Sequence, residues 1–275
     1  MGMKFNTGSS TLTAILFSAV LLPAIFSQSA CTTTLVSPGA TTLSKDRIAE
    51  IITSPDRTPA DRNADASRKP DQVLSFIGVR SGMLALDLGA SGGYTTELLA
   101  RAVGSTGRVY GQSAPRNPDS QPLPAGRLTS PQALTARAQN PAVANITPVA
   151  RKFEDPVPPE VASSGLDLVT FMFNYHDLGH MGVDRSKLNR AVFTALKSGG
   201  IYVIADHSGR PGTGISEAGT LHRIEEAFLR QEVESAGFKF VEEGNFLRNP
   251  SDPRDKNQPE ASQPKDNFIL KFAKP

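Results

Sequence analysis

The segment that decides the fold of this chain is MLALDLGASGGYTTELLA, residues 83–100. It starts as a short apolar run typical of a buried strand, and it stops at Asp87 and a cluster of glycines. Apolar residues then return at positions 94, 98, 99, 102 and 103, which is helical spacing. A strand, a glycine-rich turn and a helix open a nucleotide-binding α/β unit, because a bare backbone lets a ligand approach and a helix N-terminus offers unpaired N–H groups.

Strands and helices alternate along the rest of the chain. Further strands are predicted at residues 108–111, 145–150, 165–173, 201–205, 237–241 and 268–272. Helices are predicted at 44–52, 70–78, 94–103, 131–139, 184–196 and 215–236, whereas the polar residues 54–65 are expected to wrap over the surface. The pattern predicts an α/β fold, a Rossmann-like doubly wound sheet of seven strands. The sheet is mostly parallel with an antiparallel C-terminal strand, and helices cover both faces.

The N-terminal residues resemble an export signal. Lys4 precedes an apolar stretch, residues 12–26, which is too short and too interrupted for a comfortable membrane span. Cys31 is the only cysteine and stands where a lipoprotein signal places its acylated residue. Lipidation at Cys31 and simple cleavage near residue 30 both remain open. We therefore expect a signal segment (1–30), a tether (31–43) and a domain (44–275) that is exported, as a periplasmic protein or a membrane-anchored lipoprotein.

Composition restricts the partners of the domain. The net charge of the 275-residue chain is +2, and its Lys and Arg residues are scattered, so we expect no nucleic-acid partner. Without Cys31 the chain has no thiol, and the domain must be stable without disulfides. The sequence leaves the oligomeric state open.

The glycine-rich turn excludes two common ligands. A dinucleotide site would carry glycine where Ser91 and Tyr94 stand, and a P-loop would carry a Gly-Lys-Ser/Thr sequence. The pattern of Asp87, Gly89, Ser91 and Gly93 instead resembles the first motif of the class I S-adenosylmethionine-dependent methyltransferases. A tight turn without a ligand is the alternative, although such a turn seldom has three glycines in five residues.

Other segments extend this resemblance over residues 44–275. The sequences GVRSGM (78–83), GYTT (93–96) and GRVYG (107–111) resemble the isoaspartyl-type branch of the superfamily. The sequences FNYHDL (173–178) and ADHSGRPG (205–212) resemble a group of predicted exported bacterial methyltransferases.

The resemblance implies S-adenosylmethionine as the cofactor and assigns its contacts residue by residue. The loop would hold the methionine part, with Asp87 orienting its amino group; the implied loop contacts are Asp87, Gly89, Ala90, Ser91, Gly93 and Tyr94. Gln112 stands where the family usually has an acid for the ribose, and an amide oxygen accepts one such bond without a charge. Glu154 and Asp155 fall where the family contacts adenine, but they could equally be a solvated pair.

Candidate catalytic residues follow the fourth and fifth strands. His176 and Asp177 follow one strand and His207 follows the other, so both groups should face the crevice at the carboxyl ends of the strands. We predict His176 as the general base, with Asn174 and Tyr175 shaping the methyl-transfer face; His207 is the second choice. His222 is expected on the solvated face of the helix predicted at 215–236.

Several alternatives stay open. Asp177, Asp206, His176 and His207 could form a metal site, but spacing alone does not establish ligation, and we assign no metal ligands. The sequence favours a methyltransferase for a small-molecule or envelope substrate. Because S-adenosylmethionine is made in the cytoplasm and the signal implies export, a catalytically silent, Rossmann-like small-ligand-binding protein is the alternative. Gln112 in place of an acid favours that alternative.

Overall fold

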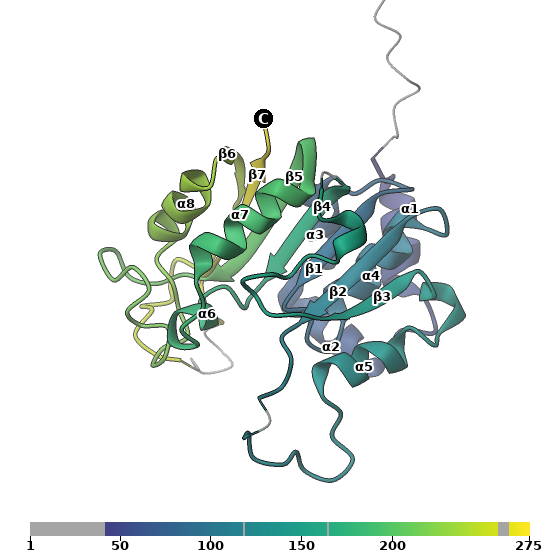
Figure 1. Ribbon diagram of the computed structural model, residues 1–275, viewed down its shortest axis with the longest axis horizontal. Coiled ribbons are helices and arrows are strands. Elements are labelled where there is room, and N and C mark those ends of the chain that lie inside the picture. Colours follow the sequence, from purple (N-terminus) through teal and green to yellow (C-terminus); the bar gives the residue numbers. More distant parts are fainter. Residues whose placement is uncertain (1–41, 118, 164, 258–263) are drawn as a thin grey trace, which may run out of the picture. The chain divides into compact units, whose positions relative to one another are not determined.

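The computed structural model describes residues 42–117, 119–163, 165–257 and 264–275, and at their centre is a seven-stranded sheet (Figure 1). Its strands are β1 (Leu84–Leu88), β2 (Arg108–Ser113), β3 (Ile146–Ala150), β4 (Leu166–Met172), β5 (Leu196–His207), β6 (Lys239–Gly244) and β7 (Asn267–Ala273). The order is β3-β2-β1-β4-β5-β7-β6, and β7 runs antiparallel to both of its neighbours. The predicted fold class is therefore confirmed. The predicted signal segment and most of the tether, including Cys31, lie outside the described residues.

Two apolar clusters lie on the two faces of the sheet. One face packs against α1 (Lys45–Thr53), α3 (Pro70–Ile77) and α4 (Tyr94–Val103), and the other against α7 (Arg185–Ala195) and α8 (Glu226–Ser235). Strand β1 alternates between these clusters, with Ala85 in the first and Leu86 in the second. This alternation turns Asp87 toward α4, which begins directly after the glycine-rich loop.

The prediction of a helix over residues 215–236 is wrong for the first half of that segment. Helix α8 covers only Glu226–Ser235, and residues 214–221 form turns. Gly214 (φ 53°) and His222 (φ 50°) both have left-handed backbone conformations, which a helix interior does not accommodate. His222 therefore lies on an irregular segment and not on a helical face.

Residues 54–65, expected to wrap over the surface as a polar segment, include most of helix α2 (Pro59–Arg68). Its N-terminus has a regular cap, because the Thr58 hydroxyl accepts from the Asp61 N–H at 3.1 Å and Pro59 stands at the first helical position. The helix shows no apolar stripe, which explains why periodicity did not predict it. Its C-terminal end, Arg68, reaches the rim of the cavity described below.

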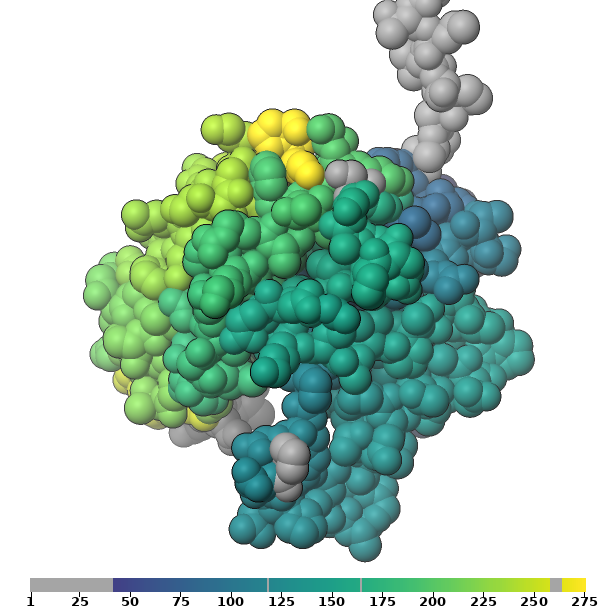
Figure 2. All heavy atoms as spheres, viewed as in Figure 1, coloured from purple at the N-terminus to yellow at the C-terminus, as the bar shows by residue number. Residues whose placement is uncertain are grey.

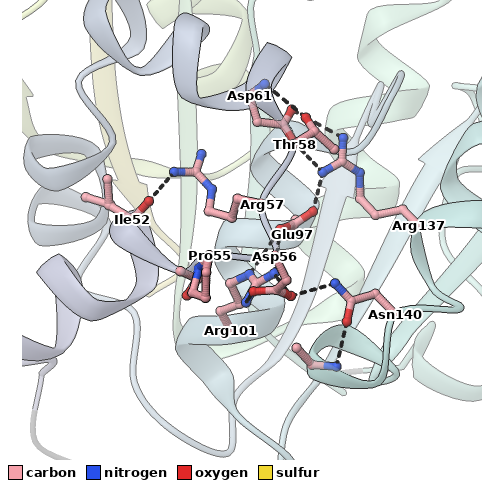
Figure 3. Close-up of polar contacts among 12 residues, drawn as sticks. Ile52, Pro55, Asp56, Arg57, Thr58, Asp61, Glu97, Arg101, Arg137 and Asn140 are labelled. Carbon is pink, nitrogen blue, oxygen red and sulfur yellow. Dashed lines mark hydrogen bonds and ion pairs between the residues drawn. The ribbon is translucent and has the colours of Figure 1, made fainter.

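A network of ion pairs anchors α2 and the segment before it (Figure 3). Arg101 contacts Asp56 at 2.7 Å and Glu97 at 2.8 Å, and Arg137 of α5 (Ser130–Arg137) contacts Asp61 at 2.7 Å and also Glu97. A separate ion pair joins Arg57 to Asp65 at 2.7 Å. We call these seven charged side chains the α2 network. Every charge in it meets an opposite charge, so the polar helix is held without an apolar face.

Residues 114–117 and 119–129, between β2 and α5, project away from the body of the domain (Figures 1 and 2). The remaining elements are α6 (Asp177–His180) and two short 3₁₀ turns, Pro141–Val143 and Pro159–Val161. Within the described residues, no helix combines the length and the apolar character that crossing a bilayer requires.

Candidate active site

A cavity of about 1030 Å³ opens beyond the carboxyl ends of β1, β4 and β5. Strands β1 and β4 are adjacent at the point where the strand order reverses, which is where open α/β sheets bind ligands. The described residues that line it are 66–69, 87–92, Tyr94, Thr95, 172–174, His207, 247–249, Asn257, Pro264, Lys265 and Asn267.

Asp87 is the buried acid at the end of β1. Its Oδ2 accepts from the Thr96 hydroxyl at 2.6 Å, and its Oδ1 accepts from the Thr170 hydroxyl at 2.8 Å. Burial raises the pKa of Asp87 to about 6, although both hydroxyl hydrogen bonds act to lower it. The carboxylate thus has hydroxyl partners but no ion pair, and it lines the cavity.

The glycine-rich loop is held in a tight, partly strained turn. Gly89 (φ 59°), Ser91 (φ 50°) and Gly93 (φ 83°) all have left-handed backbones. A Cβ on Gly89 would lie 3.0 Å from the Phe171 ring, so this close approach also requires glycine. A Cβ on Gly92 would meet open space. The loop therefore exposes bare backbone to the cavity, as the sequence indicated.

Strained backbone concentrates around this cavity. Among the described residues, five that are not glycine have a positive φ, and three of them line the cavity: Lys69, Ser91 and Phe173. Such conformations persist only where surrounding structure holds them, and they gather at binding sites.

Gln112 holds the loop in place. Its side chain is fully buried; Oε1 accepts from the Gly89 N–H at 3.0 Å, and Nε2 donates to the Arg151 carbonyl at 2.7 Å. It does not line the cavity. The oxygen that the sequence assigned to the ribose is therefore already used by the loop backbone.

The two acids assigned to adenine are also away from the cavity lining. Glu154 Oε1 accepts from the Asp184 N–H at 3.4 Å, and Asp155 forms an ion pair with Arg151. The structure thus does not bring Gln112, Glu154 or Asp155 together with Asp87 at the cavity surface.

His207 is the histidine that lines the cavity. Its Nδ1 lies 2.6 Å from Asn267 Oδ1, and Asn267 Nδ2 donates to the Lys265 carbonyl at 3.2 Å. This second bond fixes the amide so that its oxygen faces the imidazole, and Nδ1 must then carry the proton. Burial lowers the pKa of His207 to about 4. The ring is neutral, and its Nε2 has a lone pair.

His176, the predicted base, lies behind His207 and does not line the cavity. Its Nδ1 is 2.6 Å from Asp206 Oδ1, and its Nε2 is 3.2 Å from Asp177 Oδ1. Burial alone would lower the pKa of His176, but the two carboxylates outweigh it and raise the pKa to about 9. Tyr175 is also turned away, since its hydroxyl donates to Glu232 at 3.0 Å. Of the predicted methyl-transfer face, the structure brings Asn174 to the cavity, together with His207, the second choice for the base.

Sequence reasoning missed four basic residues in the cavity lining: Arg68, Lys69, Arg248 and Lys265. Among the described lining residues, Asp87 is the only acid. Arg68 lies 4.9 Å from the Tyr94 ring and 5.3 Å from the Phe173 ring. These residues come from the end of α2 and from the chain between β6 and β7, and no sequence motif marks them.

Solved structures with the same arrangement of strands identify the fold. A methyltransferase from Aquifex aeolicus that depends on S-adenosylmethionine superposes with a TM-score of 0.55 at 16% identity, covering 85% of this chain and 100% of that one. A candidate sarcosine dimethylglycine methyltransferase from Galdieria sulphuraria gives 0.54 at 15% identity, with 84% and 98% covered. The chain has the class I methyltransferase fold.

A third structure, a candidate methyltransferase from Bacillus halodurans, superposes with a TM-score of 0.51 at 14% identity over 74% of this chain and 97% of that one. No protein-family model and no curated protein sequence matches the chain. At such low identity the similarity concerns the methyltransferase fold, and chemistry must be argued from the site itself.

Proposed function

We propose that the chain is an S-adenosylmethionine-dependent methyltransferase that acts on a small-molecule acceptor. One observation carries this proposal: the acidic, glycine-rich loop lines a large cavity at the switch point of a methyltransferase fold. Asp87 is buried there without a cationic partner in direct contact, which suits the ammonium group of the amino-acid part of the cofactor.

The residues fit one end of this cofactor better than the other. Asp87 and the bare backbone of residues 89–92 fit the methionine end. No described acid lines the cavity beyond Asp87, so the ribose hydroxyls would depend on neutral partners. We therefore expect weaker binding than a carboxylate at the end of β2 would give.

His207 is the residue we propose as general base. S-adenosylmethionine supplies a methyl group already activated on sulfur, so the protein mainly aligns the acceptor and removes its proton. His207 Nε2 can take that proton, while Asn267 holds Nδ1–H and keeps the ring oriented. Because basic side chains surround the cavity, we propose an acceptor that carries a carboxylate or another anionic group.

Calorimetry with S-adenosylmethionine and S-adenosylhomocysteine tests the cofactor. We expect binding that Asp87→Asn weakens strongly and that the exposed control Asp119→Asn leaves unchanged. Lack of binding at millimolar cofactor contradicts the proposal. Release of S-adenosylhomocysteine with a panel of small carboxylates and phosphates then identifies the acceptor, and His207→Gln should keep cofactor binding while turnover is lost.

A silent ligand-binding protein is a second candidate, favoured by the internal use of Gln112 and the basic cavity lining. This function predicts binding of a small anion without any binding of S-adenosylmethionine. The same calorimetric titration separates the two candidates.

The cell envelope is the proposed location, on the basis of residues 1–30 and the resemblance of residues 173–178 to exported methyltransferases. Fractionation of cells that express the full chain tests export. Metabolic labelling with a fatty acid, compared between the wild type and Cys31→Ser, distinguishes a lipid anchor from simple cleavage.

A further inference from the structure

All four histidines of the chain gather in one group beside the cavity. The ring centroids of His207 and His176 lie 5.4 Å apart, those of His176 and His222 5.5 Å, and those of His222 and His180 5.7 Å. They come from the end of β5, from α6 and the residue before it, and from the irregular segment before α8. Tertiary structure therefore assembles the group from three separate segments.

Three of these imidazoles converge on one carboxylate oxygen, Asp177 Oδ1. His222 Nδ1 lies 2.9 Å from it, His176 Nε2 3.2 Å and His180 Nδ1 3.8 Å. Around a tetrahedral ion with bonds of about 2.0–2.2 Å, neighbouring ligand atoms are separated by roughly 3.3 Å. The separations of Asp177 Oδ1 from His176 and His222 are close to such an edge, and that from His180 is longer. The ligand atoms of His176, Asp177 and His222 all lie within 4.8 Å of one another.

The partners of His176 orient it as a ligand. Asp206, which is fully buried, lies 2.6 Å from His176 Nδ1 and also accepts from the His176 backbone N–H at 2.8 Å. In metal-bound histidines a carboxylate usually holds one ring nitrogen, and this orients the other nitrogen toward the metal. Here that second nitrogen is Nε2, which faces Asp177.

His222 is held in place by its neighbour. Its backbone is in the left-handed region, φ 50°, which is strained for a residue other than glycine. The next residue, Arg223, is fully buried, with Nη1 2.9 Å from Asp252 and 3.0 Å from the Ser208 carbonyl. This anchor keeps the imidazole of His222 beside Asp177.

We propose that His176, Asp177 and His222 bind a divalent transition-metal ion of the zinc type, with His180 as a fourth ligand. Imidazole nitrogens together with one carboxylate suit Zn²⁺, Co²⁺ or Ni²⁺, whereas Mg²⁺ and Ca²⁺ take oxygen ligands. The side chain of His176 is only 4% exposed, but those of Asp177 (28%) and His222 (38%) reach solvent, so an ion can enter. The site does not depend on methyl transfer, because none of its three main ligands lines the cavity.

The test uses the full chain carrying Cys31→Ser, which removes the only thiol of the protein. After treatment with a chelator, the protein is titrated with Zn²⁺ by calorimetry and with Co²⁺ by visible absorption. We expect one site per chain and a Co²⁺ spectrum typical of low coordination number. His222→Asn and Asp177→Asn should weaken binding by at least about 100-fold, since loss of even an outer partner costs roughly 10- to 100-fold. Asparagine at 222 also tolerates the positive φ.

Two further variants sharpen the result. Asp206→Asn should weaken binding by about 10- to 100-fold through loss of orientation alone. Asp119→Asn, an exposed acid far along the chain, should leave it unchanged. Far-ultraviolet circular dichroism confirms that each variant is folded. The proposal is overturned if the wild type binds neither ion, or if folded His222→Asn and Asp177→Asn both bind as the wild type does.

Discussion

Two groups of charged and titratable side chains differ in how their charges are satisfied. In the α2 network each arginine meets one or two carboxylates. The buried pair Arg101 and Glu97, drawn in Figure 3, is only 7% and 5% exposed. In the histidine cluster, three imidazole nitrogens point at a single oxygen of Asp177. The first group is complete by itself and joins α2, α4 and α5. The second group gathers three nitrogen atoms around one oxygen atom, all of types that can ligate a metal ion.

The comparison shows that burial of charge does not by itself indicate a functional site. A network of matched opposite charges has a structural role. Its effect is seen mainly in the loss of stability when one partner is removed. A group of electron-pair donors that share one point is what a metal ion needs. Variants in the two regions should therefore behave differently.

The largest effect is expected from Arg137→Met in the α2 network. This change leaves Asp61 without its ion-pair partner and Glu97 with one partner fewer. Breaking a buried pair in this way should lower the free energy of unfolding by roughly 3–5 kcal/mol. Denaturant unfolding measures the loss, with exposed Arg190→Met as the control expected to stay within about 0.5 kcal/mol. A small loss at Arg137 would show that the network does not hold α2.

The histidine cluster should respond to metal in a way that the network does not. At a Zn²⁺ concentration of about 100 times the Kd, the free energy of unfolding should rise by about 2.7 kcal/mol. The increase should fall to about 0.4 kcal/mol or less in His222→Asn but persist in Arg137→Met, because only the former removes a ligand. Thermal unfolding with and without Zn²⁺ gives this contrast. Equal stabilisation of both variants would contradict it.

Placing a charge at Gln112 tests a buried position that has neither matched opposite charges nor converging ligand atoms around it. Gln112→Glu replaces the donor to the Arg151 carbonyl with an acceptor and puts a carboxylate in a fully buried site. Loss of the buried hydrogen bond should destabilise the protein by about 1–3 kcal/mol. Gln112→Met is the matched neutral variant. We expect no gain in affinity for S-adenosylmethionine, and a clear gain by calorimetry would instead assign residue 112 to the ribose.

Asp87 is the intermediate case, a buried acid with hydroxyl partners and only the more distant charge of Arg68. Burial raises its pKa from the ordinary value of 3.8 to about 6. At a pH between these two values, Asp87 of the ligand-free protein holds a proton, and an ammonium ligand must displace that proton. Affinity for S-adenosylmethionine should then be full above about pH 6 and fall by up to about tenfold, 1.4 kcal/mol, per pH unit below it.

Calorimetry between pH 4.5 and 7.5, chosen to span about 1.5 units on either side of that pKa, measures this dependence. Asp87→Asn should bind weakly at every pH in the range. Wild-type affinity that does not change with pH would show that Asp87 is not the partner of the ammonium group.

Local sequence patterns predicted the sheet, the loop and the edge of the sheet at which the cavity opens. Leu84–Leu88 and its glycine-rich turn combine apolar runs with a glycine cluster, and such signals are contained within a few residues. Helix α2 could not be predicted in this way, because ion pairs to Arg137, more than 70 positions away, replace the apolar stripe. The first half of the helix predicted at 215–236 failed for a related reason, since Arg223 is held by Asp252 and the Ser208 carbonyl in an irregular segment.

The sequence by itself determined the fold class and the place of Asp87 at the cavity, because strand alternation and the carboxyl-end rule follow from chain geometry. Only the tertiary structure decided which side chains face the cavity. It turned His207 toward the cavity and His176 away from it, and it engaged Gln112 with the loop. It also brought His222 to Asp177, 45 positions earlier in the chain. These outcomes depend on hydrogen bonds between distant segments, which no local pattern encodes.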